Sequence, residues 1–146
     1  MKLKVAWIGK SKESHFQSLA EEYLKRIGRY AEIEGVALKQ EAALLELSRK
    51  PSGPRHTLVV LDERGRQLSS QGWAAFLRDC QDRHRSPLLF AIGSANGFSR
   101  QTVEAADHVL SFGPMTVAHE LARVMLLEQL YRAFTILKGH PYHSGH

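Results

Sequence analysis

The sequence predicts an α/β protein in which a mostly parallel β-sheet is covered by helices on both faces. Three observations indicate this fold class. Five short runs of strand character alternate with five segments of helical spacing, the apolar runs are nearly continuous, and glycine-containing loops follow three of them. The 146 residues show neither internal repeats nor low-complexity tracts, so we expect a single domain spanning residues 1–146.

The first half of the chain predicts two strands and two helices. Residues 3–8 form an apolar run that ends at Gly9. Residues 33–38 predict a second strand and residues 41–49 a second helix. The prolines in residues 51–54 are expected to stop that helix, because proline lacks the N–H that a helix needs. Between the two strands, a helix is indicated by apolar residues spaced three and four apart, namely Phe16, Leu19, Tyr23, Leu24 and Ile27.

The second half predicts three more strands and three more helices. The only cysteine, Cys80, falls near Phe76 and Leu77, where we expect a small buried side chain that forms no internal disulfide. In order, the predicted elements are a strand at 56–61, a helix at 70–83, a strand at 88–92, a helix at 99–106, a strand at 109–112 and a helix at 118–137.

The last helix is apolar on more than one stripe, so one face cannot hide all of its apolar side chains. Either it lies centrally within the monomer or it packs against a second copy, and a terminal helix is well placed for a two-fold dimer. Two polar pairs lie one turn apart on it, His119 with Arg123 and Glu128 with Arg132, and the second is expected to be an ordinary ion pair. The tail at 138–146 is expected to be too polar to pack.

Three loops leave the carboxyl ends of predicted strands, which is where ligands bind in folds of this class. They are residues 62–65, 93–97 and 113–117. Because glycine has no Cβ, Gly93 and Gly97 let backbone amides approach a ribose, an adenine or a phosphate closely. The glycine spacing matches neither the dinucleotide fingerprint nor a Walker loop, so a plain turn is the alternative to a ligand site.

The charge balance favours an anionic partner without identifying one. Lys and Arg exceed Asp and Glu by 20 to 15, which gives a formal net charge of +5, and the isoelectric point is about 9.6. No cleavage-site pattern follows the N-terminal apolar run, and nowhere do about eighteen uncharged apolar residues follow one another. We expect a soluble cytoplasmic protein with no membrane partner.

The C-terminal third contains a specific set of motifs, Met115-Thr-Val-Ala-His119, Arg123, Glu128-Gln-Leu-Tyr-Arg132-Ala133 and His140-Pro-Tyr-His143. These motifs resemble the RlmH-type ribosomal RNA methyltransferases of the SPOUT class, and the resemblance extends over essentially the whole chain. It implies a SPOUT-type (α/β knot) methyltransferase fold with a C-terminal trefoil knot, a homodimer and S-adenosylmethionine as cofactor. It also implies methylation of N3 of a pseudouridine in the 23S ribosomal RNA of the large subunit.

By position, the resemblance also implies a cofactor site. Backbone groups of the 112–117 loop would read the adenine edge, while Leu61 and Met115 would sandwich the ring, although core packing is the alternative for Leu61. The family usually has two adjacent glycines where this chain has Gly93 and Ser94, so Ser94 departs from the pattern. The full set of expected cofactor contacts is Leu61, Gly93, Phe112, Gly113, Pro114, Met115, Thr116 and Val117.

The resemblance makes Tyr142 and His143 the catalytic candidates. Tyr142 would stack on or hydrogen-bond to the target base, and His143 would contact its imide as base or as orienter. A frayed tail with no role is the alternative. For His119 and Arg123 two alternatives stay open, contact with the RNA or a structural pair with each other. A basic residue often follows the last histidine in the family, and here Ser144 stands instead.

Two other hypotheses concern the tail and the fold. His140, His143 and His146 recur every three residues, a spacing that could bind zinc or nickel, but Pro141 argues against the required helix and we expect no metal. The second hypothesis is a catalytically silent RNA-binding or ribosome-associated protein on the same fold, suggested by the two serine departures. A small basic domain without an appended RNA module favours a preformed target, the large subunit or the assembled ribosome.

Overall fold

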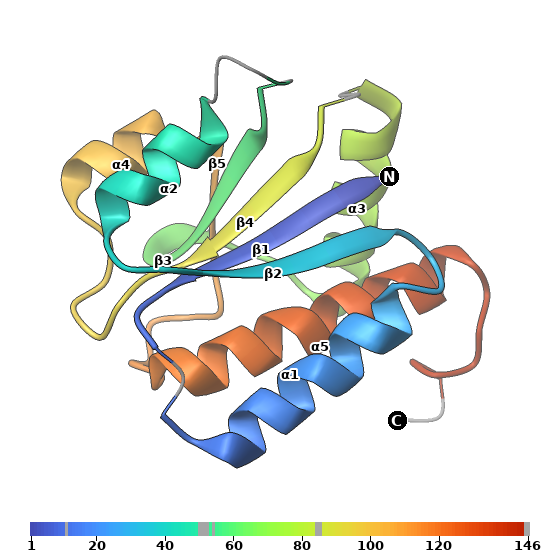
Figure 1. The fold of residues 1–146 in the computed structure, drawn as a ribbon. Helices are drawn as coiled ribbons and strands as arrows, with labels where there is room; N and C mark the ends of the chain where they lie inside the picture. Colours follow the sequence, from blue (N-terminus) through green and yellow to red (C-terminus); the bar gives the residue numbers. More distant parts are fainter. Residues whose placement is uncertain (11, 50–52, 54, 84–85, 145–146) are drawn as a thin grey trace.

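The computed structural model describes residues 1–10, 12–49, 53, 55–83 and 86–144. Its centre is a five-stranded, parallel sheet with the strand order β2-β1-β4-β3-β5, and helices cover both faces (Figure 1). The predicted fold class is confirmed, and the trefoil knot stays a prediction. The elements are β1 (Lys2–Ile8), α1 (Ser14–Ile27), β2 (Glu32–Leu38), α2 (Glu41–Ser48), β3 (Thr57–Gln67), α3 (Ser70–Arg83), β4 (Leu88–Ile92), α4 (Arg100–Ala105), β5 (His108–Ser111) and α5 (His119–Leu137).

The largest departure from the predicted elements is in β3, which continues through the residues 62–65 that we expected to form a loop. Its register with β5 breaks there, because Leu61 and Arg66 both pair with Leu110. The chain therefore bulges outward and returns to the same neighbour, so the prediction of a plain loop was wrong. Gly65 allows this return, since a Cβ there would lie 2.6 Å from the backbone carbonyl carbon of Leu110. Residues 51, 52 and 54, expected to help stop α2, lie outside the described residues.

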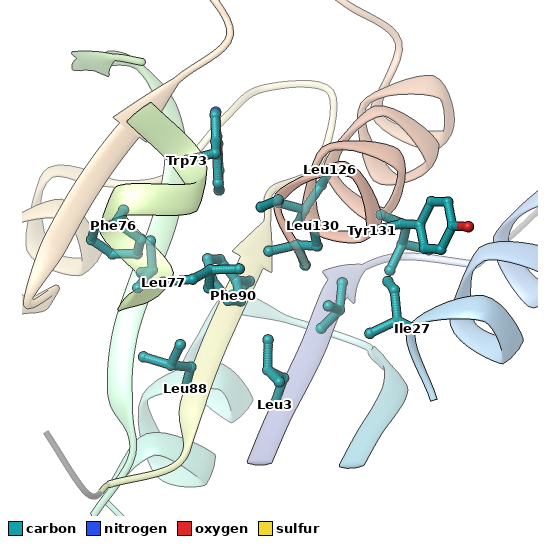
Figure 2. Close-up of a cluster of buried hydrophobic side chains, with 14 of the residues drawn as sticks. Leu3, Ile27, Trp73, Phe76, Leu77, Leu88, Phe90, Leu126, Leu130 and Tyr131 are labelled. Carbon is teal, nitrogen blue, oxygen red and sulfur yellow. The ribbon is translucent and has the colours of Figure 1, made fainter. Parts of the chain in front are cut away.

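The continuous apolar runs are explained by burial on both faces of the sheet. On β4, Leu88, Phe90 and Ile92 belong to a larger core with α1, α3 and α5, whereas Leu89 and Ala91 belong to a smaller core with α2 and α4. Figure 2 shows the larger core, where side chains from the strands meet those of the three helices. Labelled there are Leu3, Ile27, Trp73, Phe76, Leu77, Leu88, Phe90, Leu126, Leu130 and Tyr131. Cys80 is buried in this core as expected.

Helix α5 packs against both α1 and α3 on one face of the sheet (Figure 1). Most of its apolar surface is therefore covered within the monomer, which matches the first of the two explanations for its apolar character. Leu121 of α5 is 41% exposed and Leu19 of α1 is 46% exposed. Within the described ranges, no helix combines the length and apolar character needed to cross a membrane.

Candidate active site

A cavity of about 490 Å³ lies beyond the carboxyl ends of β4 and β5 and beside the bulge in β3. The loops that follow parallel strands meet at this edge of the sheet, the usual ligand position in α/β folds. Pro114, also expected there, is exposed and is not part of the lining. The lining includes seven of the eight residues expected to hold the cofactor, namely Leu61, Gly93, Phe112, Gly113, Met115, Thr116 and Val117.

Glycines shape the walls of this cavity. A Cβ on Gly93 would lie 3.2 Å from the carbonyl carbon of Gly97 and 3.3 Å from the ring of Phe98, so the backbone packs closely there. Gly97 has a φ of +75° and Gly113 a φ of +117°, conformations that favour glycine. Ser94, where the family usually has a second glycine, is exposed, so the wall accommodates its side chain.

The Asp62–Arg64 pair joins two walls of the cavity. Arg64 donates from Nε to Asp62 Oδ1 at 2.7 Å and from Nη2 to Oδ2 at 2.9 Å. Nη2 also donates to the carbonyl oxygen of Phe98 at 2.9 Å, which ties the β3 bulge to the loop after β4. The Asp62 side chain is only 5% exposed, and the hydrogen bonds from Arg64 lower the pKa of its carboxyl group.

Two apolar side chains complete the cavity. Leu61 is 9% exposed and belongs both to the larger core and to the lining, so core packing and ligand contact are compatible for it. Met115 is 78% exposed, an unusual state for a large apolar side chain and one that suits covering a flat ring. The combination of exposed backbone groups with apolar side chains fits the adenosine part of S-adenosylmethionine.

The first turns of α5 are tied to the N-terminal part of the chain. Glu120 accepts a hydrogen bond from the backbone N–H of Lys12 at 2.7 Å. The guanidinium of Arg123 lies 4.3 Å from the centre of the Trp7 ring, and burial lowers its pKa. Arg123 is 1% exposed, which favours a structural role over RNA contact at this position. His119 is half-buried and lines the cavity.

Tyr142 is held against α5, so the expectation that the tail is too polar to pack was wrong. Its hydroxyl donates to Glu128 Oε2 at 3.0 Å. Its ring meets the ring of Tyr131 edge-on, with 4.7 Å between centroids, and the guanidinium of Arg132 lies 4.9 Å from its centre. Burial, followed by hydrogen bonds that include the one to Glu128, raises the pKa of the Tyr142 hydroxyl. The hydroxyl group of Tyr142 is thus satisfied by a carboxylate of α5.

His143 is held from two helices. Its Nδ1 lies 3.0 Å from Arg132 Nη1 of α5, and its Nε2 lies 3.1 Å from Gln71 Nε2 of α3. Glu128 and Arg132 form the predicted ion pair, with 2.6 Å between Oε2 and Nη2. The two residues of this ion pair also contact the catalytic candidates, since Glu128 accepts from Tyr142 and Arg132 lies against His143. A frayed tail is therefore contradicted for Tyr142 and His143.

A second cavity, of about 580 Å³, connects the two sets of candidates. Its lining comes mainly from α1, α3 and α5, and it includes Glu128, which anchors Tyr142. It shares Ser111 and Phe112 with the first cavity. The structure therefore brings seven of the eight cofactor candidates into one cavity and places Glu128, which holds Tyr142, on an adjoining one.

No metal centre is found in the described part of the chain, where no three His, Cys, Asp or Glu side chains could hold an ion together. His140 accepts a hydrogen bond through Nδ1 from the backbone N–H of Tyr142 at 3.2 Å. His146, the third member of the histidine spacing, lies outside the described residues.

Sequence comparison gives full-length relatives. The chain is 53% identical over 146 residues, all of both chains, to the ribosomal RNA large subunit methyltransferase H of Koribacter versatilis (strain Ellin345). It is 41% identical over 152 aligned positions to the protein of the same name from Geobacter sulfurreducens, which covers 98% of this chain and 99% of the relative.

Solved structures share the fold at low identity. A probable methylase family protein from Haemophilus influenzae has a TM-score of 0.61 at 10% identity and covers 96% of this chain and 69% of its own. The SpoU methyltransferase AviRb from Streptomyces viridochromogenes, in complex with AdoMet, has a TM-score of 0.56 at 14% identity and covers 90% of this chain and 57% of its own. The family described as "Predicted SPOUT methyltransferase" matches residues 1–143. Together with the full-length relatives, this match shows that the chain belongs to the SPOUT methyltransferases, in the group of ribosomal RNA large subunit methyltransferase H.

Proposed function

We propose that this chain transfers a methyl group from S-adenosylmethionine to N3 of a pseudouridine in the large-subunit ribosomal RNA. The observation that carries the proposal is the cavity beyond β4 and β5, lined by seven of the eight residues assigned to the cofactor. The names of the full-length relatives support the RNA substrate. The proposal treats residues 1–146 as a single domain. It also places the protein's action in the cytoplasm, because its proposed substrate is ribosomal RNA.

The cavity supplies binding and orientation rather than a covalent nucleophile. The cofactor, when bound, brings a sulfonium methyl group that is already a strong electrophile. Leu61 and Met115 would hold the adenine between them, and the backbone of the 112–117 loop would read its edge. Gly93 would let the loop after β4 approach the ribose. The Asp62–Arg64 pair would keep the two walls at a fixed separation, so that the methyl group faces the incoming base.

The target base would meet the tail. Tyr142 presents a half-buried aromatic ring, and aromatic faces are a common platform for an unstacked RNA base. His143 would contact the imide that loses its N3 proton. His119, half-buried in the cavity lining, stays a candidate RNA contact, whereas the burial of Arg123 supports a structural role for that residue.

The proposed assembly is a homodimer in which the cavity of one subunit combines with the tail of the other. Support comes from the exposed Leu19 and Leu121 and from the second cavity, whose lining is mostly apolar and includes Leu19 and Met125. A second copy covering this face would shield these apolar side chains. The substrate would be the large subunit or the assembled ribosome.

The test uses the full chain and a chain cut after Lys138, with a chain cut after Ser144 as the matched control that keeps Tyr142 and His143. Calorimetry measures S-adenosylmethionine binding, and methyl incorporation is measured on ribosomes that lack the N3 mark. We expect all three chains to bind the cofactor and only the chain cut after Lys138 to lose methylation. Absence of cofactor binding by the folded full chain would contradict the cavity assignment. Equal methylation by both truncated chains would contradict the role of the tail.

A further inference from the structure

The two contacts of His143 restrict where its ring proton can be. Arg132 Nη1, 3.0 Å from Nδ1, carries only donor hydrogens. A neutral imidazole has one N–H and one acceptor nitrogen, so Nδ1 must be the acceptor and Nε2 must carry the hydrogen. A protonated ring would point an N–H at the guanidinium and place two positive charges together. The contact with Arg132 therefore selects the neutral ring protonated at Nε2.

The Gln71 side chain must then face His143 with its oxygen. The terminal group of the Gln71 amide at the Nε2 end lies 3.1 Å from His143 Nε2, and a neutral imidazole that already accepts from Arg132 cannot accept from a second donor. The oxygen and nitrogen of a side-chain amide are assigned from the hydrogen-bond network, and this network places the Gln71 oxygen, not its nitrogen, toward His143 Nε2. The Nε2–H of His143 is thus a donor that already points at a carbonyl-type oxygen.

Arg132 is itself fixed in place. Glu128 Oε1 accepts from Arg132 Nε at 3.2 Å, and Oε2 accepts from Nη2 at 2.6 Å, which leaves Nη1 to His143. The two side chains are only 14% and 20% exposed, so the pair is shielded from water. Tyr142 adds its ring below the guanidinium and donates its hydroxyl hydrogen to Glu128. The orientation of His143 is therefore held by a chain of three neighbours.

We propose that Arg132 is a positioning residue that holds His143 in the Nε2–H form, so that His143 donates a hydrogen bond to a carbonyl oxygen of the target base. This inference rests on the proposed contact between the tail and the pseudouridine, and it decides between the two roles open to His143. The carbonyl oxygen of the base takes the position of the Gln71 oxygen. His143 then stabilises the imide anion and does not remove its proton.

The reaction balances without a protein base at this position. The N3–H proton leaves to solvent hydroxide or water, and the negative charge spreads over N3 and its two flanking carbonyl oxygens. The Nε2–H of His143 stabilises one of these oxygens. The N3 electron pair forms the new N–C bond while the S–CH3 bond breaks, and the sulfur keeps the electron pair of that bond.

The first experiment observes the ring directly in the full-length protein. With 15N-labelled histidine, the ring nitrogen shifts of His143, identified by their loss in His143→Gln, report which nitrogen carries hydrogen. We expect the Nε2–H pattern in the parent chain and in Arg78→Met, which removes an exposed arginine of α3. Arg132→Met is expected to lose this single pattern. A ring protonated at Nδ1 or at both nitrogens in the parent chain at neutral pH would overturn the proposal, whatever the RNA activity.

The second experiment measures single-turnover methylation of ribosomes lacking the N3 mark. Gln places an N–H donor near the Nε2 position, whereas Asn places one near Nδ1. We expect His143→Gln to stay within about tenfold of the parent rate and His143→Asn to lose about a hundredfold, the range found for a single oxyanion donor. Calorimetry with S-adenosylmethionine checks that both variants keep the cofactor site, whose lining does not include His143.

The pH dependence separates a donor from a base. The charged and titratable groups around the ring are Arg132 and Glu128 of α5, Tyr142 of the tail and Tyr23 of α1, which bonds Tyr142. We expect parent and His143→Gln rates to rise with pH in parallel. The donor role would be overturned by two results together: a rate that drops on acidification through a histidine titration in the parent chain alone, and a His143→Gln variant as inactive as His143→Asn. If no chain methylates the ribosome, the proposed function fails. The ring protonation of His143 is still tested independently by the 15N experiment.

Discussion

At the scale of single residues, the least expected feature is the Asp62–Arg64 pair. The resemblance to a known family pointed to glycines and apolar residues in the cofactor cavity, and no spacing rule singles out an acid and a base two positions apart. The pair becomes visible only when the bulge in β3 brings Arg64 to the carbonyl oxygen of Phe98. Conversely, Arg123 matched its motif, but the sequence could not show that the Trp7 ring would cover it.

Replacing Arg64 is expected to destabilise the fold. Arg64→Ala leaves the Asp62 carboxylate, 5% exposed, without its charged partner. We expect the free energy of unfolding, measured with urea, to fall, because a largely buried carboxylate loses hydrogen-bond partners. The affinity for S-adenosylmethionine is expected to fall with it, because the two cavity walls lose their connection. Arg78→Ala, at an exposed site, should change stability by less than about 0.5 kcal/mol.

The same pair predicts the pH dependence of stability. Because Arg64 lowers the pKa of Asp62 in the folded state, ionised Asp62 stabilises the fold above its unfolded pKa, and this contribution is lost as pH falls through the lower folded pKa. Urea unfolding from neutral to acidic pH should therefore show a steeper acid loss for the parent chain than for Asp62→Asn. Curves of identical shape would mean that Asp62 does not contribute this pH-dependent stability.

At the scale of elements, the sequence predicted every strand and helix to within two residues, apart from the end of β3. Continuous apolar runs such as 88–92 predict fully buried strands, and Gly9 marks the end of β1. Residues 62–65 carry polar side chains and a glycine, which is the composition of a loop. Only the pairing of Arg66 with Leu110, a long-range contact, returns them to the sheet. The packing of the tail escaped prediction for the same reason, because its partners lie on α3 and α5.

A side chain at Gly65 is expected to disrupt the edge of the sheet. In Gly65→Ala the new Cβ would lie 2.6 Å from the backbone of Leu110, so β3 and β5 must separate. We expect a loss of about 2 kcal/mol or more in the free energy of unfolding, as for other overpacked sites. Gly53→Ala is the matched control and should leave stability nearly unchanged, because none of the described residues lies within 4 Å of the added carbon. Equal unfolding midpoints for the two variants would contradict the close approach of the strands.

At the scale of the whole molecule, the exposed side chains of α1 and α5 mark the face on which we expect the second subunit. The apolar character of α5 raised the possibility of a dimer, but the structure uses most of that surface in its own core. The exposed apolar side chains on these two helices are Leu121 of α5 and Leu19 of α1, and Leu19 also lines the second cavity. A composite site would then depend on contacts that a single chain does not make.

Charging this face is expected to separate the subunits. Leu19→Glu introduces a charge where a second copy would bury an apolar side chain, so light scattering after size-exclusion chromatography should show a shift from dimer to monomer. Methylation should be lost while each chain keeps its fold by circular dichroism. Lys25→Glu, a charge reversal at an exposed position of the same helix, serves as the control and should stay dimeric. A Leu19→Glu chain that remains dimeric and active would place the interface elsewhere.

The position of α5 has a consequence for how the chain is made. This helix supplies Leu126, Leu127, Leu130 and Phe134 to the larger core, between side chains of α1, α3 and the sheet. In chain order α5 follows all five strands of the sheet, so a nascent chain that already carries these strands still lacks the centre of that core until α5 has been made. Because these long-range contacts need α5, we expect the native core to form only after that helix has been synthesised.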